Sequence, residues 1–310
     1  MAIVYTFVTM LFLRRLFYIP AINIAIATLL RPFSRLMPAK LKFPVYGPFW
    51  FKIPGNKKAK YYTNPTSYHS KLLFWGGFEG FEYNSSRIFI QFAKNAQCMF
   101  DIGSNIGYYS LIAHAANSNV RVFAFEPMPA PNAYLTKNLK NNGLKNFTVS
   151  DVAISNTNST ATFYAISNPK LPFIKDQLAG DGGLSTGHSG YRSKLEVNVK
   201  TIKLDDYVAA NLPANMLIDL IKLDTEATEH WVLEGAHNVL STHRPIIMCE
   251  VITGQIEHEL EAILSKYNYA YYATSDNGLI EVTSIVNQKE LKTEYFFVPV
   301  EKKAIVNTLS

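Results

Sequence analysis

Apolar runs and helix-forming segments alternate through the middle of this 310-residue chain. The apolar runs Cys98–Ile102, Val120–Phe125 and Phe147–Ile154 have the length and composition of buried strands. Between them lie two segments, Tyr108–Ala116 and Ala130–Asn142, with the character of helices. Strands that alternate with helices favour a parallel sheet covered on both faces. The pattern therefore predicts an α/β fold with a doubly wound, mostly parallel sheet.

The second half of the chain adds an insertion and then returns to the same rhythm. Thr160–Ile166 and Leu195–Leu204 alternate like the strands of an inserted β-hairpin, with the glycine-rich loop Gly180–Gly190 between them. The elements that follow are a strand at Leu217–Leu223, a helix at Glu226–Leu240, a strand at Ile246–Val251, a helix at Gln255–Tyr267, and closing strands at Tyr269–Ala273 and Glu294–Val300. The resulting sheet has seven strands.

The front of the chain differs in composition from this core. Residues 31–75 contain six prolines and many lysines and aromatics, which is typical of irregular or short-strand structure. A helix is expected at Ser85–Lys94, just ahead of the first core strand. We therefore divide the chain into an apolar, basic N-terminal extension at 1–75 and a main domain at 76–310.

The first 30 residues are mostly apolar, but two features argue against a single spanning helix. Arg14 and Arg15 interrupt the apolar stretch, and neither half reaches the roughly 20 residues that a bilayer requires. Pro20 would break or kink a continuous helix. A segment lying on a membrane surface is the preferred interpretation, with helices packed on protein, or a span or signal peptide, as the alternatives.

Charge is distributed unevenly along the chain. No Asp or Glu precedes Glu79, whereas 11 of the 30 basic residues do. The net charge of +6 thus combines a cationic front with a mildly acidic body. A cationic, apolar front suits an anionic membrane surface as a partner.

The two cysteines, Cys98 and Cys249, both lie in strand-like runs. We expect buried free thiols, which fit a reducing compartment and provide no metal-ligand spacing. The expected location is cytoplasmic, or peripheral at the inner face of a membrane.

A glycine turn after the first core strand carries the clearest chemistry. The turn contains Asp101, Gly103, Asn105 and Gly107, and the next strand ends in Glu126. This is the layout of a nucleoside-binding unit. An anionic pyrophosphate would require a bare backbone where Asn105 stands and no carboxylate beside it. An acid at Asp101 suits the amine and sulfonium of S-adenosylmethionine, and Glu126 could accept hydrogen bonds from the ribose hydroxyls.

Further motifs follow in a fixed order. They are Gly80-Phe81-Glu82, Phe125-Glu126-Pro127-Met128-Pro129, Ser150-Asp151-Val152, Ile221-Lys222-Leu223-Asp224-Thr225-Glu226-Ala227-Thr228-Glu229, and Arg244–Val251 ending at Glu250. From Gly76 to Val251 the chain resembles the FkbM-type family of S-adenosylmethionine-dependent methyltransferases. It departs from the family pattern at Ser104, where alanine is usual, and at Ala227, where glycine is usual.

The resemblance implies roles for several residues. Asp101, Gly103, Asn105 and Gly107 would form the cofactor loop, and Glu126 would bind the ribose. Asp151 and Val152 would flank the adenine, and Glu82 would close over the methionine end of the cofactor. The substitution at Ala227 could alter the acceptor side of the pocket if the glycine is needed for its backbone conformation.

The fourth strand ends in a group of charged residues. Lys222 and Asp224 should point to one face of the sheet, and Glu226 and Glu229 should share a helix face. Asp224 or Glu226 is expected to touch substrate or cofactor. His188, in the glycine-rich loop, and Glu250 are the candidate general bases. A divalent metal held by Asp224, Glu226 and Glu250 could assist, although the spacing does not require one.

The preferred function is O-methylation of a hydroxyl on a sugar, a glycolipid or a related metabolite. A dinucleotide oxidoreductase conflicts with Asn105, and a non-catalytic scaffold conflicts with the retained acids. A nucleic-acid methyltransferase that binds phosphate through the basic front is a further alternative. No base-stacking tetrapeptide follows the fourth strand, so no nucleic acid is expected as a partner. Neither the acceptor nor an oligomeric state is indicated.

Overall fold

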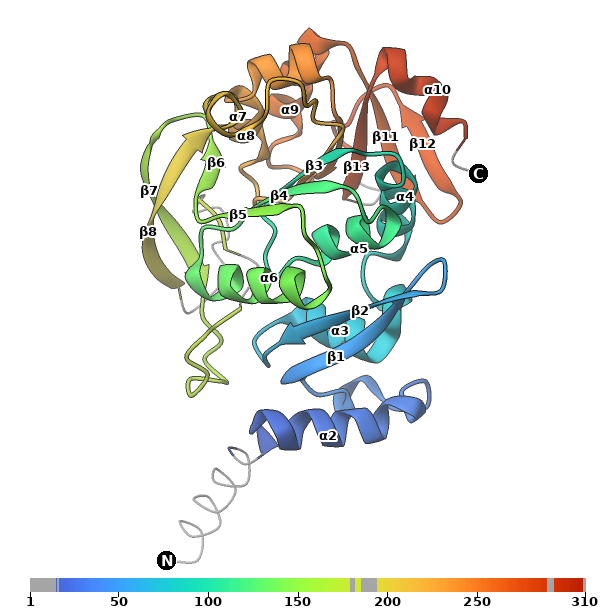
Figure 1. Ribbon diagram of the computed structural model, residues 1–310, viewed down its shortest axis with the longest axis vertical. Coiled ribbons are helices and arrows are strands. Elements are labelled where there is room, and N and C mark those ends of the chain that lie inside the picture. Colours follow the sequence, from blue (N-terminus) through green and yellow to red (C-terminus); the bar gives the residue numbers. More distant parts are fainter. Residues whose placement is uncertain (1–14, 16, 179–181, 185–193, 289–292, 309–310) are drawn as a thin grey trace, which may run out of the picture.

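A large twisted sheet forms the centre of the molecule. The computed structural model describes residues 15, 17–178, 182–184, 194–288 and 293–308 (Figure 1). Eight strands pair in the order β12-β11-β13-β10-β9-β3-β4-β5. Their bounds are β3 Cys98–Ile102, β4 Arg121–Phe125, β5 Phe147–Ser150, β9 Leu220–Leu223, β10 Ile246–Glu250, β11 Tyr269–Ser275, β12 Gly278–Val282 and β13 Glu294–Pro299. This confirms the α/β class.

The sheet is parallel from β10 through β9, β3 and β4 to β5, and antiparallel from β10 through β13 and β11 to β12. The prediction of seven strands was wrong by one. The eighth, β12, pairs with β11 across the two-residue turn Asp276-Asn277, so that Ser275 faces Gly278. Asp, Asn and Gly tolerate the backbone of such tight turns, which makes this hairpin possible.

Helices cover both faces, as the alternation predicts. On one face lie α4 Tyr83–Ala93, α5 Tyr108–Ala116 and α6 Pro129–Asn141, whereas α7 Leu204–Asn211, α8 Glu229–Glu234 and α9 Glu257–Leu264 cover the other. The side chains of β3 divide accordingly, since Met99 joins the first core and Cys98, Phe100 and Ile102 join the second. Cys98 and Cys249 are buried free thiols, as expected. The short C-terminal helix α10 comprises Lys303–Val306.

Two helix and strand boundaries differ from the sequence-based expectation. The predicted helix at 226–240 is reduced to α8, followed by a π-helical turn at Val239–His243. The predicted strand at 147–154 is divided, because its second half is β6 Ala153–Ser155 of another sheet. That second sheet contains β6, β8 Lys194–Lys203 and β7 Ser159–Ile166, in this order. Its antiparallel pair, β7 and β8, is the predicted inserted hairpin.

Residues 31–75 are more regular than their prolines suggest. The hairpin β1 Gly47–Ile53 with β2 Lys57–Thr63 is followed by α3 Tyr68–Gly76, and their apolar side chains belong to the first core. Side chains of α6 and of the residue that follows it bind one edge of β2, since Asn138 and Asn142 accept hydrogen bonds of 2.7 Å from the backbone N–H groups of Tyr62 and Lys60. The hairpin is thereby held directly against the sheet domain.

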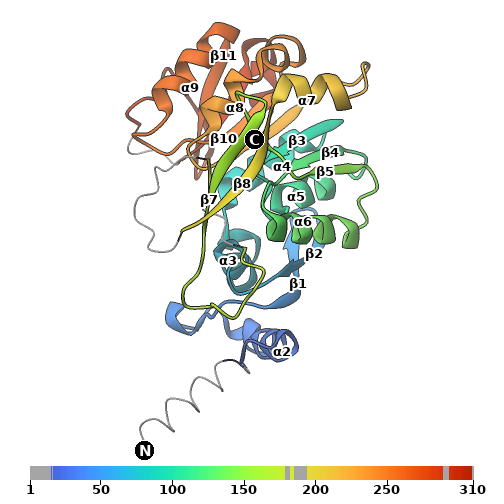
Figure 2. The same ribbon diagram turned by 90° about the vertical axis from the view of Figure 1, so that its left-hand side faces the viewer.

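Helix α2, Pro20–Leu30, lies beneath β1 in both views (Figures 1 and 2). Two short helical turns, Arg31–Phe33 and Ala39–Leu41, connect it to the hairpin. Among the residues that the structure describes, no helix has both the length and the apolar character needed to cross a membrane.

Candidate functional site

A pocket lies at the carboxyl edge of the large sheet, where β3, β4 and β9 end. Ligands of open α/β sheets bind at this edge. Eight of the residues singled out in the sequence line the pocket, namely Glu82, Asp101, Gly103, Asn105, Glu126, Val152, Asp224 and Glu226. The chain folds so that acids from widely separated motifs meet in one hollow.

The glycine turn is packed against the end of β9. Gly103 has a φ of +78°, and a Cβ atom built on it would lie 1.7 Å from the carbonyl oxygen of Asp224. Glycine is therefore required at this position both for conformation and for close approach. Ser104, where the family usually has alanine, donates a hydrogen bond to the carbonyl of Asp101 and accepts one of 3.0 Å from the N–H of Phe125. Its hydroxyl joins the turn to β4.

Glu126 is fixed by the backbone. Its Oε2 accepts a 2.9 Å hydrogen bond from the N–H of Asn105, and its Oε1 accepts one of 2.9 Å from the N–H of Met128. Burial raises the pKa of Glu126 to about 8, although these two N–H groups act to lower it. Each carboxylate oxygen keeps a further lone pair, so the ionised group can accept hydrogen bonds from two hydroxyl groups on the pocket side.

Asp101 is buried at the end of β3. Its Oδ2 accepts hydrogen bonds from both the hydroxyl and the N–H of Ser110 in α5, the latter at 3.0 Å. Burial raises the pKa of this carboxyl to about 6, with Ser110 and Lys222 opposing the shift. At neutral pH an anionic Asp101 can attract a ligand cation.

Lys222 supplies the central positive charge. It is almost fully buried in β9, its Nζ lies 3.2 Å from Oδ2 of Asp224, and it sits 5.0 Å from the ring centroid of Tyr109. Burial alone would lower the pKa of Lys222, but Asp224, Glu82 and Glu250 outweigh it and raise the pKa above its usual value. The pKa of Asp224 lies below its ordinary value, because Lys222 overcomes the opposing effect of burial. As expected, Lys222 and Asp224 share a face.

The turn after β9 has an unusual backbone. Glu226 and Ala227 have φ values of 59° and 67°, in the left-handed region that favours glycine. A glycine would adopt this conformation without strain, whereas Ala227 adopts it at some cost. Because the turn reverses direction, Glu226 lines the pocket, whereas Glu229 is buried and accepts bonds from the N–H and hydroxyl of Thr225. The expectation that Glu226 and Glu229 share a helix face was wrong, since α8 begins only at Glu229.

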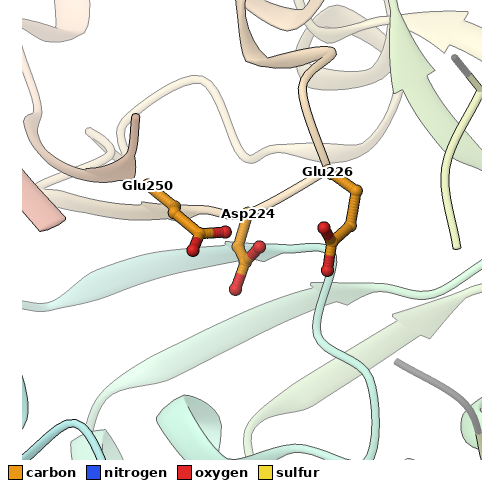
Figure 3. Close-up of side chains that lie close together, drawn as sticks. All are labelled: Asp224, Glu226 and Glu250. Atoms are coloured by element: carbon orange, nitrogen blue, oxygen red, sulfur yellow. The ribbon is translucent and has the colours of Figure 1, made fainter. Parts of the chain in front are cut away.

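Asp224, Glu226 and Glu250 converge at this edge (Figure 3). One oxygen of each carboxyl group lies within 4.8 Å of the others. Three carboxylates are a suitable donor set for a hard divalent cation. Lys222, however, already places an ammonium group beside Asp224. Asp224 and burial raise the pKa of Glu250 to about 10, so Glu250 keeps its proton at neutral pH and shares it with Asp224.

Glu82 lines the pocket from the residue just before α4. It precedes α4 in a left-handed conformation, with φ 42°, and accepts a hydrogen bond from the hydroxyl of Tyr109. Burial raises its pKa to about 7. Glu82 is thus positioned to face the same space as Asp101 and Asp224.

Not every predicted residue lines the pocket. Gly107, with φ +88°, begins α5 and packs against Leu135 of α6. Asp151 is exposed outside the lining, beside Val152, which does line it. Glu250 contacts the pocket acids from β10 without lining the pocket itself. His188 lies outside the described residues.

Sequence reasoning missed three residues of the pocket wall, two of them with rings and one aliphatic. His69 and Leu73 of α3, together with Tyr61 of β2, line it from the N-terminal extension. The ring of His69 stacks on Phe81 with the ring centroids 4.8 Å apart, and its imidazole, when protonated, lowers the pKa of Asp224. No motif surrounds His69 in the sequence, so only the fold could reveal that it faces the acids.

The donors and acceptors of the pocket fit a cationic nucleoside cofactor. Glu126 is held by two backbone amides and faces the pocket, and Asp101 lies at the adjoining strand end. Within the described part of the chain, the buried Oδ1 of Asn105 has no hydrogen-bond partner. A buried amide oxygen without a partner is costly, which indicates that a ligand donor completes it.

Comparisons with known proteins agree with this chemistry. The family model described as the methyltransferase FkbM domain matches residues 101–271. The chain is 27% identical over 197 residues to 31-O-demethyl-FK506 methyltransferase FkbM of Streptomyces tacrolimicus, covering 57% of this chain and 74% of that protein. It is 26% identical over 186 residues to hexuronic acid methyltransferase AglP of Haloferax volcanii, covering 60% and 68%.

Among solved structures, the chain is similar to the methyltransferase FkbM of Methylobacillus flagellatus. The TM-score is 0.42 with 17% identity, and the match covers 65% of this chain and 43% of that one. The matched region therefore spans less than half the length of that structure.

Proposed function

This chain belongs to the FkbM methyltransferase family, and we propose that it transfers the methyl group of S-adenosylmethionine to a hydroxyl oxygen of a sugar, a glycolipid or a related metabolite. Membership of the family makes it a methyltransferase. The identity of the methyl donor and the oxygen atom as acceptor are what we propose. The observation that carries the donor assignment is Glu126, which two backbone amides hold with its free lone pairs toward the pocket. A ribose diol matches that acceptor pair.

The residues that would hold the donor follow from the pocket. Glu126 would accept from the ribose hydroxyls, and Asn105 would offer its unpartnered Oδ1 to a ligand N–H or O–H. Asp101 and Glu82 would face the cationic methionine end. Val152 would contact the adenine, and its exposed neighbour Asp151 could reach the exocyclic amine only at the rim.

When bound, S-adenosylmethionine supplies an electrophilic methyl carbon, so that a C–O bond to the acceptor forms as the C–S bond breaks. The protein must align the acceptor oxygen and receive its proton. Glu250 is poorly suited to receive it, because its pKa of about 10 keeps it protonated. We assign the base to His69, with Asp224 stabilising the imidazolium that results.

The acidic group at the strand ends does not need a metal in this scheme. Lys222 forms an ion pair with Asp224, and the nearby carboxyl of Glu82 helps to raise the pKa of Lys222. A second cation would have to compete with a buried ammonium that is already paired. We therefore propose that transfer does not depend on a divalent metal.

The acceptor class rests on the pocket wall and on the names of two relatives. Tyr61, His69 and Phe81 offer flat faces of the kind that pack against sugar rings. One relative is named for a 31-O-demethyl substrate and another for hexuronic acid. An oxygen acceptor on a ring fits these observations.

Comparison of cells with and without the gene tests this function. Mass spectrometry of their glycans and lipids should show one species that loses a single methyl group in the deletion strain. Fragmentation should place that methyl on an oxygen. A methyl lost from nitrogen, or from nucleic acid alone, would overturn the proposed acceptor class.

A further inference from the structure

Helix α2 is apolar on every side, yet little of it is buried. Its sequence, Pro20–Leu30, has no charged residue, and only Asn23 and Ala27 are buried. Asn23 fixes the helix to the segment below the hairpin, since its side chain accepts from the N–H of Tyr46 at 2.7 Å and donates to the carbonyl of Pro44 at 3.2 Å. A helix without a polar face normally has its outer sides buried in protein or lipid.

Exposed apolar side chains continue beyond α2. Leu29 is 74% exposed and Leu36 is 85% exposed. We define the α2 surface by its exposed apolar members, Ile19, Ile22, Leu29, Phe33, Leu36 and Leu41. Isolated exposed leucines are normal, but six large apolar side chains within one short stretch indicate an interaction surface.

Basic residues interleave with this surface and acids do not. Arg35 and Lys40 are exposed between Phe33 and Leu41. Arg31 is directed inward instead, with a 2.7 Å bond to the carbonyl of Trp50 and its guanidinium 4.7 Å from the Phe74 ring centroid. No Asp or Glu precedes Glu79 in the sequence. The exposed charge of this face is therefore cationic.

We propose that the α2 surface docks on the headgroup region of an anionic lipid bilayer. Apolar side chains that enter the interface, flanked by basic residues that meet anionic lipid, are the features of a surface-lying segment. A second copy of the chain fits less well, because an isologous contact would bring two cationic faces together. Nucleic acid fits less well, because six apolar side chains would face phosphate.

The docking surface and the pocket share one element. The Nε1 of Trp75 in α3 donates to the carbonyl of Phe43 at 2.9 Å, beside the α2 layer, while His69 and Leu73 of the same helix line the pocket. Both views show α3 between α2 and the large sheet (Figures 1 and 2). A membrane bound to the α2 surface would therefore lie on the side of α3 that faces away from the large sheet, and α3 would connect the docking surface to the pocket.

Vesicle co-sedimentation of the full chain tests the proposal. We expect binding to vesicles of phosphatidylcholine with roughly a third phosphatidylglycerol, and little binding to phosphatidylcholine alone. The double variant Leu29→Glu/Leu36→Glu should weaken binding about tenfold or more, and Arg35→Glu/Lys40→Glu should do the same. The matched control Leu217→Glu/Ile280→Glu alters equally apolar side chains, 55% and 47% exposed, that lie far along the chain. It should bind as the wild type does.

Melting temperatures of all three variants within the wild-type range would show that each is folded. Wild-type binding by Leu29→Glu/Leu36→Glu would overturn the proposal, since the described surface would then contribute nothing. Failure of the wild type to bind anionic vesicles would overturn it as well. So would a dimer, or a complex with duplex nucleic acid, that the same double variant abolishes while vesicle binding persists.

Discussion

Gly103 lies so close to Asp224 that no side chain can separate them. A Cβ atom at Gly103 would stand 1.7 Å from the carbonyl oxygen of Asp224. The contact joins the cofactor turn after β3 to the acidic group after β9. The glycine therefore couples the two halves of the pocket as well as forming a turn.

Substitution of Gly103 should accordingly be far more damaging than its φ alone predicts. Gly143 provides the matched control, because it has the same φ of +78° and a Cβ atom added to it would have no neighbouring atom within 4 Å. Gly143→Ala should cost about 1–2 kcal/mol of unfolding free energy from conformation. Gly103→Ala should cost about 2 kcal/mol more, because the backbone must shift. Equal costs in denaturant titrations would contradict the close approach.

Cofactor binding should depend on pH through Glu126. Its pKa of about 8 lies above its ordinary value of 4.5 because of burial, so the free protein holds this carboxyl partly protonated at neutral pH. Hydroxyl donors require the ionised form, and affinity for S-adenosylhomocysteine should rise from about pH 6 to about pH 9. Calorimetry across this range should show the rise in the wild type and its loss in Glu126→Gln. A rise that persists in Glu126→Gln would assign it to another group.

The same shift has a consequence for stability without ligand. A group whose folded pKa is raised stabilises the fold below its unfolded pKa, and this contribution is lost as pH rises through the folded value. For Glu126 that window extends from about 4.5 to about 8. The ligand-free protein should therefore lose stability across that window, while the protection that S-adenosylhomocysteine gives against thermal unfolding should rise with its affinity, from about pH 6 to about pH 9.

His69 should be needed for transfer but not for cofactor binding. Loss of a general base typically lowers the rate about 10²–10⁴-fold. His69→Ala and His69→Gln, expressed in cells that lack the gene, should fail to restore the methylated product. The purified variants should bind S-adenosylhomocysteine as the wild type does. His258→Ala, which alters an exposed histidine of α9, is the control and should restore the product fully. Restoration by both His69 variants would exclude it as the base.

Metal removal should leave the protein unaffected. The ammonium group of Lys222 lies 3.2 Å from Asp224 and already pairs with this carboxylate, the central member of the acidic group. The melting temperature and the S-adenosylhomocysteine affinity should be the same after dialysis against EDTA and after addition of Mg²⁺ or Mn²⁺. A rise in melting temperature on adding either ion, abolished by Asp224→Asn, would instead show a metal site at Asp224, Glu226 and Glu250.

The sequence predicted the parts of the site that rest on strand ends. Asp101, Glu126 and Asp224 each follow an apolar run, and parallel strands bring their carboxyl ends to one edge. The parallel arrangement, which brings these strand ends to one edge, followed from the alternation of strands and helices, whereas the order of the strands in the sheet came only from the structure. The number of strands was harder to predict, because β12 is half-exposed and its sequence lacks a continuous apolar run.

The remaining parts depend on contacts that no local pattern encodes. His69 reaches the acids only because α3 packs on the same core as the hairpin. Glu229 does not share a helix face with Glu226, because two consecutive residues in the left-handed conformation, Glu226 and Ala227, precede α8, which begins only at Glu229. Backbone conformation of this kind is set by tertiary packing rather than by residue type.

The central claim is that the pocket binds S-adenosylmethionine through its strand-end acids. Isothermal titration calorimetry with S-adenosylhomocysteine tests it directly, on the wild type, Asp101→Asn, Glu126→Ala and the exposed control Glu196→Ala. We predict saturable binding by the wild type and the control, and about 10- to 100-fold weaker binding by each pocket variant. Absence of binding by the wild type, or wild-type affinity in both pocket variants, would contradict the account.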